Sequence, residues 1–186
     1  MPNQEQVGRE WQSGVWQRIS SLYHDEWDER FAPVVDVVIR RAGLVAGEGV
    51  LDLGSGTGSV AMQAAGLVGP TGRVVGVDLS EEMVEVARGR VAEGGPDNLT
   101  FQQGSGESIP ASDQSFDVVL SSLTLMYVID RTAAAREIAR VLRPGGRLVA
   151  AVWGGPERMR HCPVPAGRGP VWRDTAGTGR RSRHTC

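Results

Sequence analysis

Short apolar segments alternate with longer amphipathic segments along most of this chain. The apolar segments end at glycine or polar residues, as buried strands do, and they predict strands at 49–53, 73–78, 99–103, 116–122 and 147–153. Between them, apolar residues recur at helical spacing and predict helices at 59–68, 81–93 and 131–142. This alternation predicts an α/β fold, in which helices cover both faces of a parallel sheet.

The segments that flank this alternating region have a different character. Residues 11–43 are predicted to form two helical segments, the second with Pro33 in its first turn and Gly43 at its end. After residue 154 the sequence has neither helical nor strand periodicity. Three parts are therefore expected: a helical part at 1–43, the α/β region at 44–154 and an irregular tail at 155–186.

The length of 186 residues suits one domain with a sizeable core. No apolar run approaches the roughly 20 residues that a membrane-spanning helix needs, so no span is expected. The N-terminus lacks a basic region followed by an apolar stretch, which argues against a signal peptide and favours a cytoplasmic location. The two cysteines, Cys162 and Cys186, are expected to be spare thiols rather than a disulfide or metal ligands.

Charge is distributed unevenly along the chain. Residues 1–154 contain 13 arginines against 20 acidic residues, whereas residues 155–186 contain seven arginines against two. A basic segment of this kind can bind nucleic acid or an acidic surface, but its Gly-, Pro- and Arg-rich composition is also typical of GC-rich DNA translated in a shifted frame. We favour the second interpretation, so nucleic-acid binding is disfavoured.

The loop 54-GSGTG-58 is the strongest chemical signal in the sequence. It lies between a predicted strand and a predicted helix, where glycines let the backbone turn tightly and approach a ligand closely. Asp78 ends the next predicted strand, at a position where its carboxylate can accept hydrogen bonds from both hydroxyls of a ribose. The alternative role of Asp78, as a charge at the next helix N-terminus, is already served by Ser80 and its acidic neighbours.

Two features distinguish this loop from a dinucleotide-binding loop. Gly56, Gly58 and Ala61 formally fit the dinucleotide pattern, which leaves a nicotinamide-dependent oxidoreductase as a distant alternative. However, Asp52 stands directly before the loop, where its charge would repel a pyrophosphate and attract a cationic amino-acid nucleoside. The loop also has three alternating glycines, at 54, 56 and 58, a spacing that resembles that of methyltransferases.

Four segments in this order resemble the successive motifs of class I S-adenosylmethionine-dependent methyltransferases. The segments are 50-VLDLGSGTG-58, Asp78, 115-SFDVVLSS-122 and 141-VLRPGGRLV-149. By appearance the chain is similar to the small-molecule type found in ubiquinone and menaquinone biosynthesis. The resemblance implies a Rossmann-like, doubly wound sheet of strand order 3-2-1-4-5, here without the family's final antiparallel strands, and a helical lid at 1–43.

The resemblance also implies the contacts with S-adenosylmethionine. Asp52, Gly54, Ser55 and Gly56 would face the methionine part and Asp78 the ribose. The full set of implied cofactor-binding residues is Asp52, Gly54, Ser55, Gly56, Gly58, Asp78, Leu79, Met83, Ser105, Gly106, Glu107 and Ser121.

Near the adenine, the sequence follows the family pattern at two positions and departs from it at a third. Leu79 and Met83 would flank the adenine, and Ser105 stands where the family commonly has an acid for the adenine amino group. Glu107, two residues further on, is the expected substitute, with a solvated loop acid as the alternative.

The acceptor side of the site is less defined in the sequence. Ser121 and Ser122 match the positions from which the family approaches the transferable methyl, and no evident general base follows them. Tyr23, His24 and Tyr127 are the weak catalytic candidates, and no metal site is expected. Aromatic residues of the N-terminal helices serve either as lid contacts or, more commonly, as core. They are Trp11, Trp16, Tyr23 and Trp27.

Transfer of a methyl group to a small organic acceptor is therefore the favoured function. Positioning and desolvation supply much of the catalysis of such a displacement, so a dedicated catalytic residue is not required. A non-catalytic cofactor-binding remnant of a methyltransferase is the alternative. Without the final antiparallel strands, the edge of the fifth strand would be exposed, which predicts self-association there.

Overall fold

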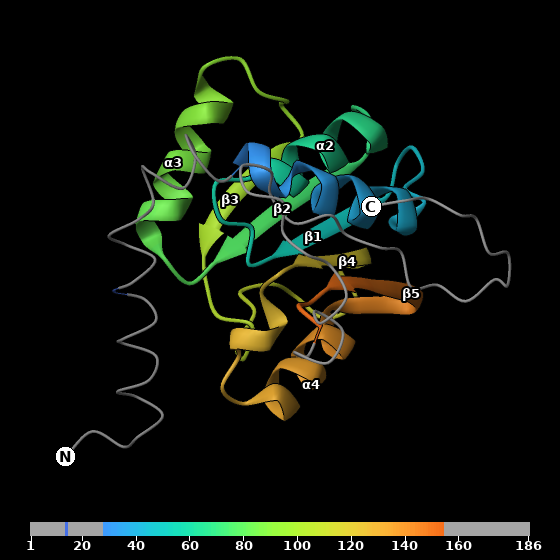
Figure 1. Cartoon of the computed structure of the whole chain (residues 1–186). Coiled ribbons are helices and arrows are strands. Elements are labelled where there is room, and N and C mark those ends of the chain that lie inside the picture. The colour runs from blue at the N-terminus through green and yellow to red at the C-terminus, as the bar shows by residue number, and fades with distance from the viewer. Residues whose placement is uncertain (1–13, 15–27, 155–186) are drawn as a thin grey trace, which may run out of the picture. The chain divides into compact units, whose positions relative to one another are not determined.

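The computed structural model describes residue 14 and residues 28–154 of the chain (Figure 1). The interpretation of residues 155–186 as an irregular tail lies outside the described residues. So do the interpretations of five N-terminal aromatic side chains: Trp11, Trp16, Tyr23, His24 and Trp27.

A five-stranded parallel sheet forms the centre of the described region. Its order is β3-β2-β1-β4-β5, which confirms the order 3-2-1-4-5. Every pair of neighbouring strands is parallel, and no strand among the described residues joins the sheet antiparallel. The strands are β1 (Gly49–Leu53), β2 (Arg73–Asp78), β3 (Leu99–Gln103), β4 (Phe116–Ser122) and β5 (Leu142–Ala151).

Helices cover both faces of the sheet, as the alternating pattern predicted (Figure 1). One core cluster joins the sheet to α2 (Ser59–Val68), α3 (Glu81–Ala92) and the helical residues 28–42. The opposite cluster joins it to α4 (Arg131–Val141). None of the helices in the described part of the chain is long and apolar enough to cross a membrane.

Strand β1 lies in the middle of the sheet, and all five of its residues are buried. Leu51 of β1 pairs with Val75 of β2 on one side and with Val119 of β4 on the other. Apolar side chains on both faces of this strand favour such a central position. Because the strands are parallel, the carboxyl ends of β1, β2 and β4 meet along one rim, and ligands of such sheets bind there.

The start of β5 differs from the predicted strand at 147–153. The chain passes from α4 directly into extended backbone at Leu142, and residues 143–146 form an irregularity within the strand rather than a turn before it. The register with β4 shifts there, from Phe116 opposite Leu142 to Val118 opposite Arg147. The prediction was wrong because the Pro-Gly-Gly signal marked a bulge, which such residues also favour.

The helical residues 28–42 also extend further back than predicted. The helix includes at least five residues before Pro33, so Pro33 does not lie in its first turn. Burial of Val35 and Val38 against the sheet offsets the hydrogen bond that a proline inside a helix loses. The helix ends at residue 42, before Gly43 at φ 54°.

Candidate functional site

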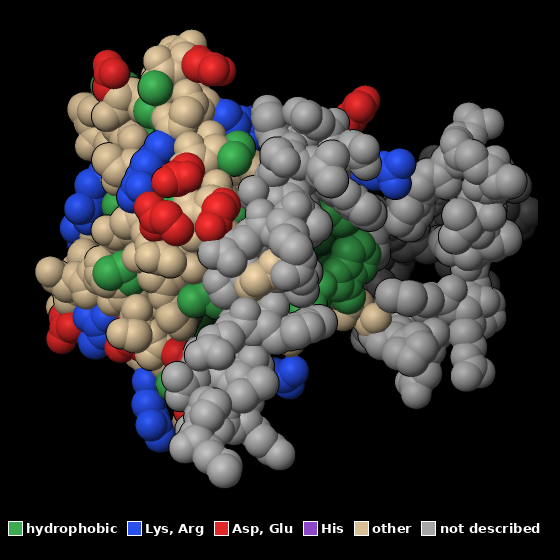
Figure 2. All heavy atoms as spheres, turned by 90° about the vertical axis from the view of Figure 1, so that its left-hand side faces the viewer, with side chains coloured by type: hydrophobic (Ala, Val, Ile, Leu, Met, Phe, Trp, Pro, Cys, Tyr) green, Lys and Arg blue, Asp and Glu red, His purple; other side chains and the backbone are tan. Residues whose placement is uncertain are grey.

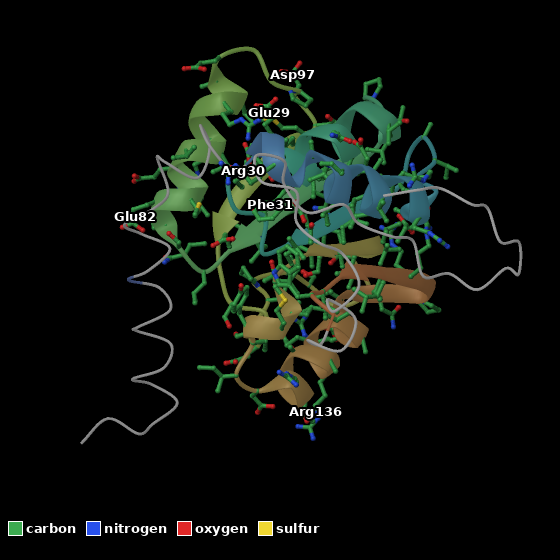
Figure 3. All side chains as sticks on the ribbon, viewed as in Figure 1. Glu29, Arg30, Phe31, Glu82, Asp97 and Arg136 are labelled. Carbon is green, nitrogen blue, oxygen red and sulfur yellow. The ribbon has the colours of Figure 1, made fainter. Side chains whose placement is uncertain are left out.

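A cleft of about 170 Å³ opens at the carboxyl rim of the sheet. Its walls are the glycine loop after β1, the end of β2, the segments after β3 and β4, and the helix over residues 28–42. Phe31 projects from that helix toward the strands (Figure 3) and lines the cleft. The cleft therefore combines segments that are up to about a hundred residues apart in the sequence.

The glycine loop is held tightly against β2 and β4. The backbone N–H groups of Gly54 and Ser55 both donate to the carbonyl of Val77, at 2.7 and 3.0 Å. Gly54 has φ 74°, and the Thr124 side chain occupies the space where a Cβ atom would be. The Thr124 hydroxyl donates to the Gly54 carbonyl at 3.2 Å. Glycine is required here by both the backbone conformation and the close approach of Thr124.

Asp78 bridges the glycine loop and the start of α3. One oxygen, Oδ2, accepts from the Gly56 N–H at 2.8 Å, and Oδ1 accepts from the Ser80 N–H at 2.9 Å. Burial raises the pKa of Asp78, and the hydrogen bonds from Ser80 and Gly56 partly offset this increase. A carboxylate oxygen has two lone pairs, so Asp78 can still accept hydrogen bonds from a ligand in the cleft.

Asp52 is the most unusual group near the cleft. It is 1% exposed, and neither carboxylate oxygen has a hydrogen-bond partner among the described residues. Burial, followed by the charge of Asp78, raises the pKa of Asp52 to about 7. The Ala61 backbone amide lowers the pKa of Asp52, although it does not reach hydrogen-bonding geometry with the carboxylate. A buried carboxyl without partners is costly, which marks this position as a functional one.

Acidic side chains also gather on the surface. Figure 2 shows several of them, with arginines among them, on the face seen from the α3 side, and Glu81 and Glu82 open that helix. The acidic residues that line the cleft itself are Asp28, Asp78 and Glu107, and Asp28 is paired with Arg90. Together with the buried Asp52, these carboxyl groups favour a cationic ligand over a phosphate.

Most of the residues that the sequence proposed as cofactor contacts line this one cleft. They are Gly54, Ser55, Gly56, Asp78, Leu79, Met83, Ser105, Gly106 and Glu107. Glu107 is also engaged elsewhere, because its Oε1 accepts from the N–H groups of Ile129 and Asp130 at 3.1 and 2.9 Å. Ser105 supports this segment by accepting from the Glu107 N–H at 3.1 Å.

Three proposed contacts do not line the cleft. Ser121 is fully buried, and its hydroxyl donates to the Leu53 carbonyl at 3.0 Å. Because successive side chains of a strand point to opposite faces, its neighbour Ser122 lines the cleft instead. Asp52 is buried within β1, the strand that precedes the loop. Gly58 has a packing role, because a Cβ atom there would lie 2.6 Å from Cζ of Phe101.

Replacing Gly58 with alanine is expected to destabilise the fold more than the same change at Gly43, where an added Cβ atom would meet no atom within 4 Å. Both glycines have a positive φ, 92° and 54°, so both variants incur backbone strain of about 1–2 kcal/mol. Only Gly58 abuts the Phe101 ring, which also lies against Gly76 and has little room to move. Overpacking adds about 1–3 kcal/mol. Chemical unfolding of the two variants measures the difference, and equal losses would contradict this packing role.

The sequence did not reveal several residues of the cleft. Asp28, Phe31 and Thr57 line it, as do Leu123 and Thr124 after β4. Leu123 has φ 57°, an uncommon conformation for leucine, and no sequence signal indicated it. The only clue to Thr57 was its place between two of the alternating glycines.

One of the catalytic candidates lies within the described residues. Tyr127 lines the cleft from the short 3-10 helix η1 (Leu125–Tyr127) and is 42% exposed. Its catalytic role stays a prediction. Among residues 28–154, no three His, Cys, Asp or Glu side chains lie together as metal ligands.

Comparison with protein families gives a match over most of the described region. Residues 44–159 match the family profile described as "Methyltransferase domain". This match covers more than half of the chain and includes all five strands.

Curated relatives and solved structures agree with the family match. A ubiquinone/menaquinone biosynthesis C-methyltransferase, UbiE, of Hahella chejuensis is 43% identical over 60% of this chain and 45% of its own length. A demethylmenaquinone methyltransferase of Lactococcus lactis is 37% identical over 70% of this chain and 49% of its own. The chain thus spans about half the length of these relatives.

Two solved structures extend the comparison to the fold. A SAM-dependent methyltransferase from Aquifex aeolicus superposes with a TM-score of 0.63 at 29% identity, covering 69% of each chain. A phosphoethanolamine N-methyltransferase from Haemonchus contortus, in complex with S-adenosyl-L-methionine, gives 0.59 at 30% identity. That match covers 63% of this chain and 27% of the other.

Proposed function

Because the chain belongs to the family of methyltransferase domains, we propose that it binds S-adenosylmethionine and transfers the methyl group to a small organic acceptor. The observation that carries this proposal is the pair of carboxyl groups, Asp52 and Asp78, on either side of the glycine loop. Asp52 is buried without a hydrogen-bond partner among the described residues, and Asp78 lines the cleft with lone pairs still available, so both carboxyl groups can interact with a cationic nucleoside beside the loop.

The residues of the cleft fit the parts of S-adenosylmethionine. Asp78 would accept hydrogen bonds from the ribose hydroxyls, and Leu79 with Met83 would contact the adenine. At Gly56, a Cβ atom would meet no protein atom within 4 Å, which leaves room for the methionine part to approach the backbone. The Ser55 hydroxyl is buried and has no partner among the described residues, so it can hydrogen-bond the same part.

The remaining wall of the cleft suits an apolar acceptor. Phe31 and Val35 lie on the helix over 28–42, and Leu123, Val128 and Ile129 lie on the segment after β4. This lining favours a small, largely apolar acceptor over a charged one. The UbiE relative, named for C-methylation in quinone biosynthesis, supports an apolar ring as the acceptor.

Catalysis at this site would rest mainly on orientation and the exclusion of water. S-adenosylmethionine supplies an activated methyl group on sulfur, and the acceptor supplies the electron pair. The chain's own residues would hold the two reactants in line and shield them, which is effective for a displacement with a good leaving group. Among the catalytic candidates, Tyr127 lies within the described residues, and it would accept a proton from the acceptor.

Calorimetric titration followed by a methyl-release assay tests this function. We expect binding of S-adenosylmethionine and S-adenosylhomocysteine in preference to NAD⁺, and methyl release with apolar ring acceptors. Binding without release, over a panel of acceptors, would support the non-catalytic alternative. Preference for NAD⁺ would contradict the proposal.

Two sequence-based expectations stay predictions alongside this function. The cytoplasmic location is one of them. Self-association through the β5 edge is the other, and it is supported by the position of β5 at the end of the sheet order among the described residues.

A further inference from the structure

Arg90 of α3 connects the glycine loop to the helix over residues 28–42. Its Nη1 donates to the Thr57 carbonyl at 2.6 Å and to Asp28 Oδ2 at 3.1 Å, and it lies 3.4 Å from the Ser59 hydroxyl oxygen. This nitrogen has two hydrogens, so the two shorter contacts account for both. A single side chain thus joins three elements beside the cleft.

Thr57 is held from two directions by this arrangement. Arg90 binds its carbonyl, and its hydroxyl donates to Asp28, with oxygen separations of 3.0 and 3.2 Å to the two carboxylate oxygens. Thr57 is 2% exposed and lies between Gly56, which Asp78 binds, and Gly58, which packs on Phe101. Arg90 therefore completes the fixation of three consecutive loop residues.

The usual explanation of such an arginine covers only part of these contacts. Arg90 lies in the last turn of α3, where a positive charge interacts favourably with the helix dipole. That interaction requires no bond to Thr57 or Asp28. The side chains of Arg90 and Asp28 are only 24% and 18% exposed, so their interaction is less screened by solvent than a surface ion pair.

Asp28 also acts on the start of α2. This helix has no acidic residue in its first turn, and its N-cap, Gly58, has no side chain with which to cap it. Asp28 reaches this helix N-terminus through Thr57, the residue directly before Gly58, and the Arg90 guanidinium beside it balances its charge. Arg90 keeps this carboxylate in place by pairing with it.

We propose that Arg90 is a positioning residue of the nucleoside site, an inference that rests on the proposed function. Arg90 itself is absent from the cleft lining, whereas Asp28 and Thr57, which it holds, form part of the wall. Loss of Arg90 releases both groups and loosens the loop that carries the methionine part. Ligand affinity then falls even though no direct contact is removed.

Binding of S-adenosylhomocysteine to Arg90→Gln tests this role. We expect affinity to fall roughly 5- to 20-fold, which is less than the roughly 10- to 150-fold expected for loss of a direct charge-assisted hydrogen bond, because Arg90 acts only through Thr57 and Asp28. Affinity is expected to fall less in Arg90→Lys, which keeps the charge. The matched control is Arg88→Gln on the same helix, where the exposed pair with Glu81 and the hydrogen bond to the Phe101 carbonyl are lost, neither of which involves the loop backbone or Asp28. Wild-type affinity in Arg90→Gln would overturn the proposal.

Thermal unfolding separates positioning from a merely structural role. Each titration is made well below the unfolding temperature of its variant, so that only folded protein is compared. A lower unfolding temperature with unchanged affinity would identify Arg90 as structural only. If Arg90→Gln does not fold, Asp28→Asn breaks the same pair from the other side and is expected to weaken binding similarly; full affinity in that variant would refute the inference.

Amide hydrogen exchange gives a result that does not depend on the ligand. We expect faster exchange in Arg90→Gln in peptides that cover residues 28–36 and 54–61, but not in Arg88→Gln. If wild type fails to bind S-adenosylhomocysteine, the proposed function fails, and exchange still decides whether Arg90 holds the loop. Unchanged exchange in both peptides would contradict the inference by itself.

Discussion

Replacing Asp78 with alanine is expected to weaken binding of S-adenosylhomocysteine by about 1.5–3 kcal/mol, or roughly 10- to 150-fold. The carboxylate is expected to accept hydrogen bonds from the ribose, and it also holds the Gly56 N–H at 2.8 Å. Both contributions are lost in the variant. Isothermal titration at pH 7.5 measures the change in affinity.

Asp117→Ala is the matched control for this variant. Asp117 also accepts a hydrogen bond from a glycine N–H, that of Gly49 at 2.7 Å, but it lies at the opposite rim of the sheet. Loss of its pair with Arg143 affects the fold and leaves the cleft intact. Equal affinity losses in the two variants, or unchanged affinity in Asp78→Ala, would refute the ribose assignment.

Replacing Asp52 with asparagine is expected to remove a pH dependence of stability. Burial raises the pKa of Asp52 from its usual 3.8 to about 7, so ionisation opposes folding. This contribution to stability is fully present below pH 3.8 and is lost as the pH rises through about 7. The unfolding free energy of Asp52→Asn, relative to wild type, should therefore increase by about 2–3 kcal/mol between pH 5 and pH 8.

The same variant is expected to bind S-adenosylmethionine more weakly. In wild type, affinity should rise between pH 5.5 and pH 7 as Asp52 ionises, because the carboxylate then attracts the cationic ligand. Asp52→Asn cannot ionise, so its affinity should stay nearly constant over this range. Parallel pH profiles of binding in the two proteins would show that Asp52 does not act on the ligand.

The sheet was predictable because its signals are local. The strands of the sheet contain apolar runs that end at glycine or polar residues, and β1 is buried throughout, as such a run predicts. The start of β5 was not predictable in the same way. Pro144 and Gly145 favour both turns and bulges, and pairing with β4, a distant segment, decides between them.

The site residues also differ in how far the sequence predicts them. Asp78 and the glycine loop are recognisable because their spacing along the chain reflects adjacent parallel strands. Asp28 and Arg90 have no such spacing, and only the packing of two separate helices and the loop brings them together. The sequence placed Ser121 at the cleft because two consecutive serines do not show which of them faces which side of the strand. In the structure Ser122 lines the cleft, and Ser121 donates to the Leu53 carbonyl instead.

A crystal structure of the chain with S-adenosylhomocysteine decides whether the cleft is the nucleoside site. We expect the ribose hydroxyls to lie within hydrogen-bonding distance of the Asp78 carboxylate and the homocysteine part to lie over Gly54–Gly56, in front of Asp52. A nucleoside bound elsewhere, or a ribose turned away from Asp78, would contradict this assignment.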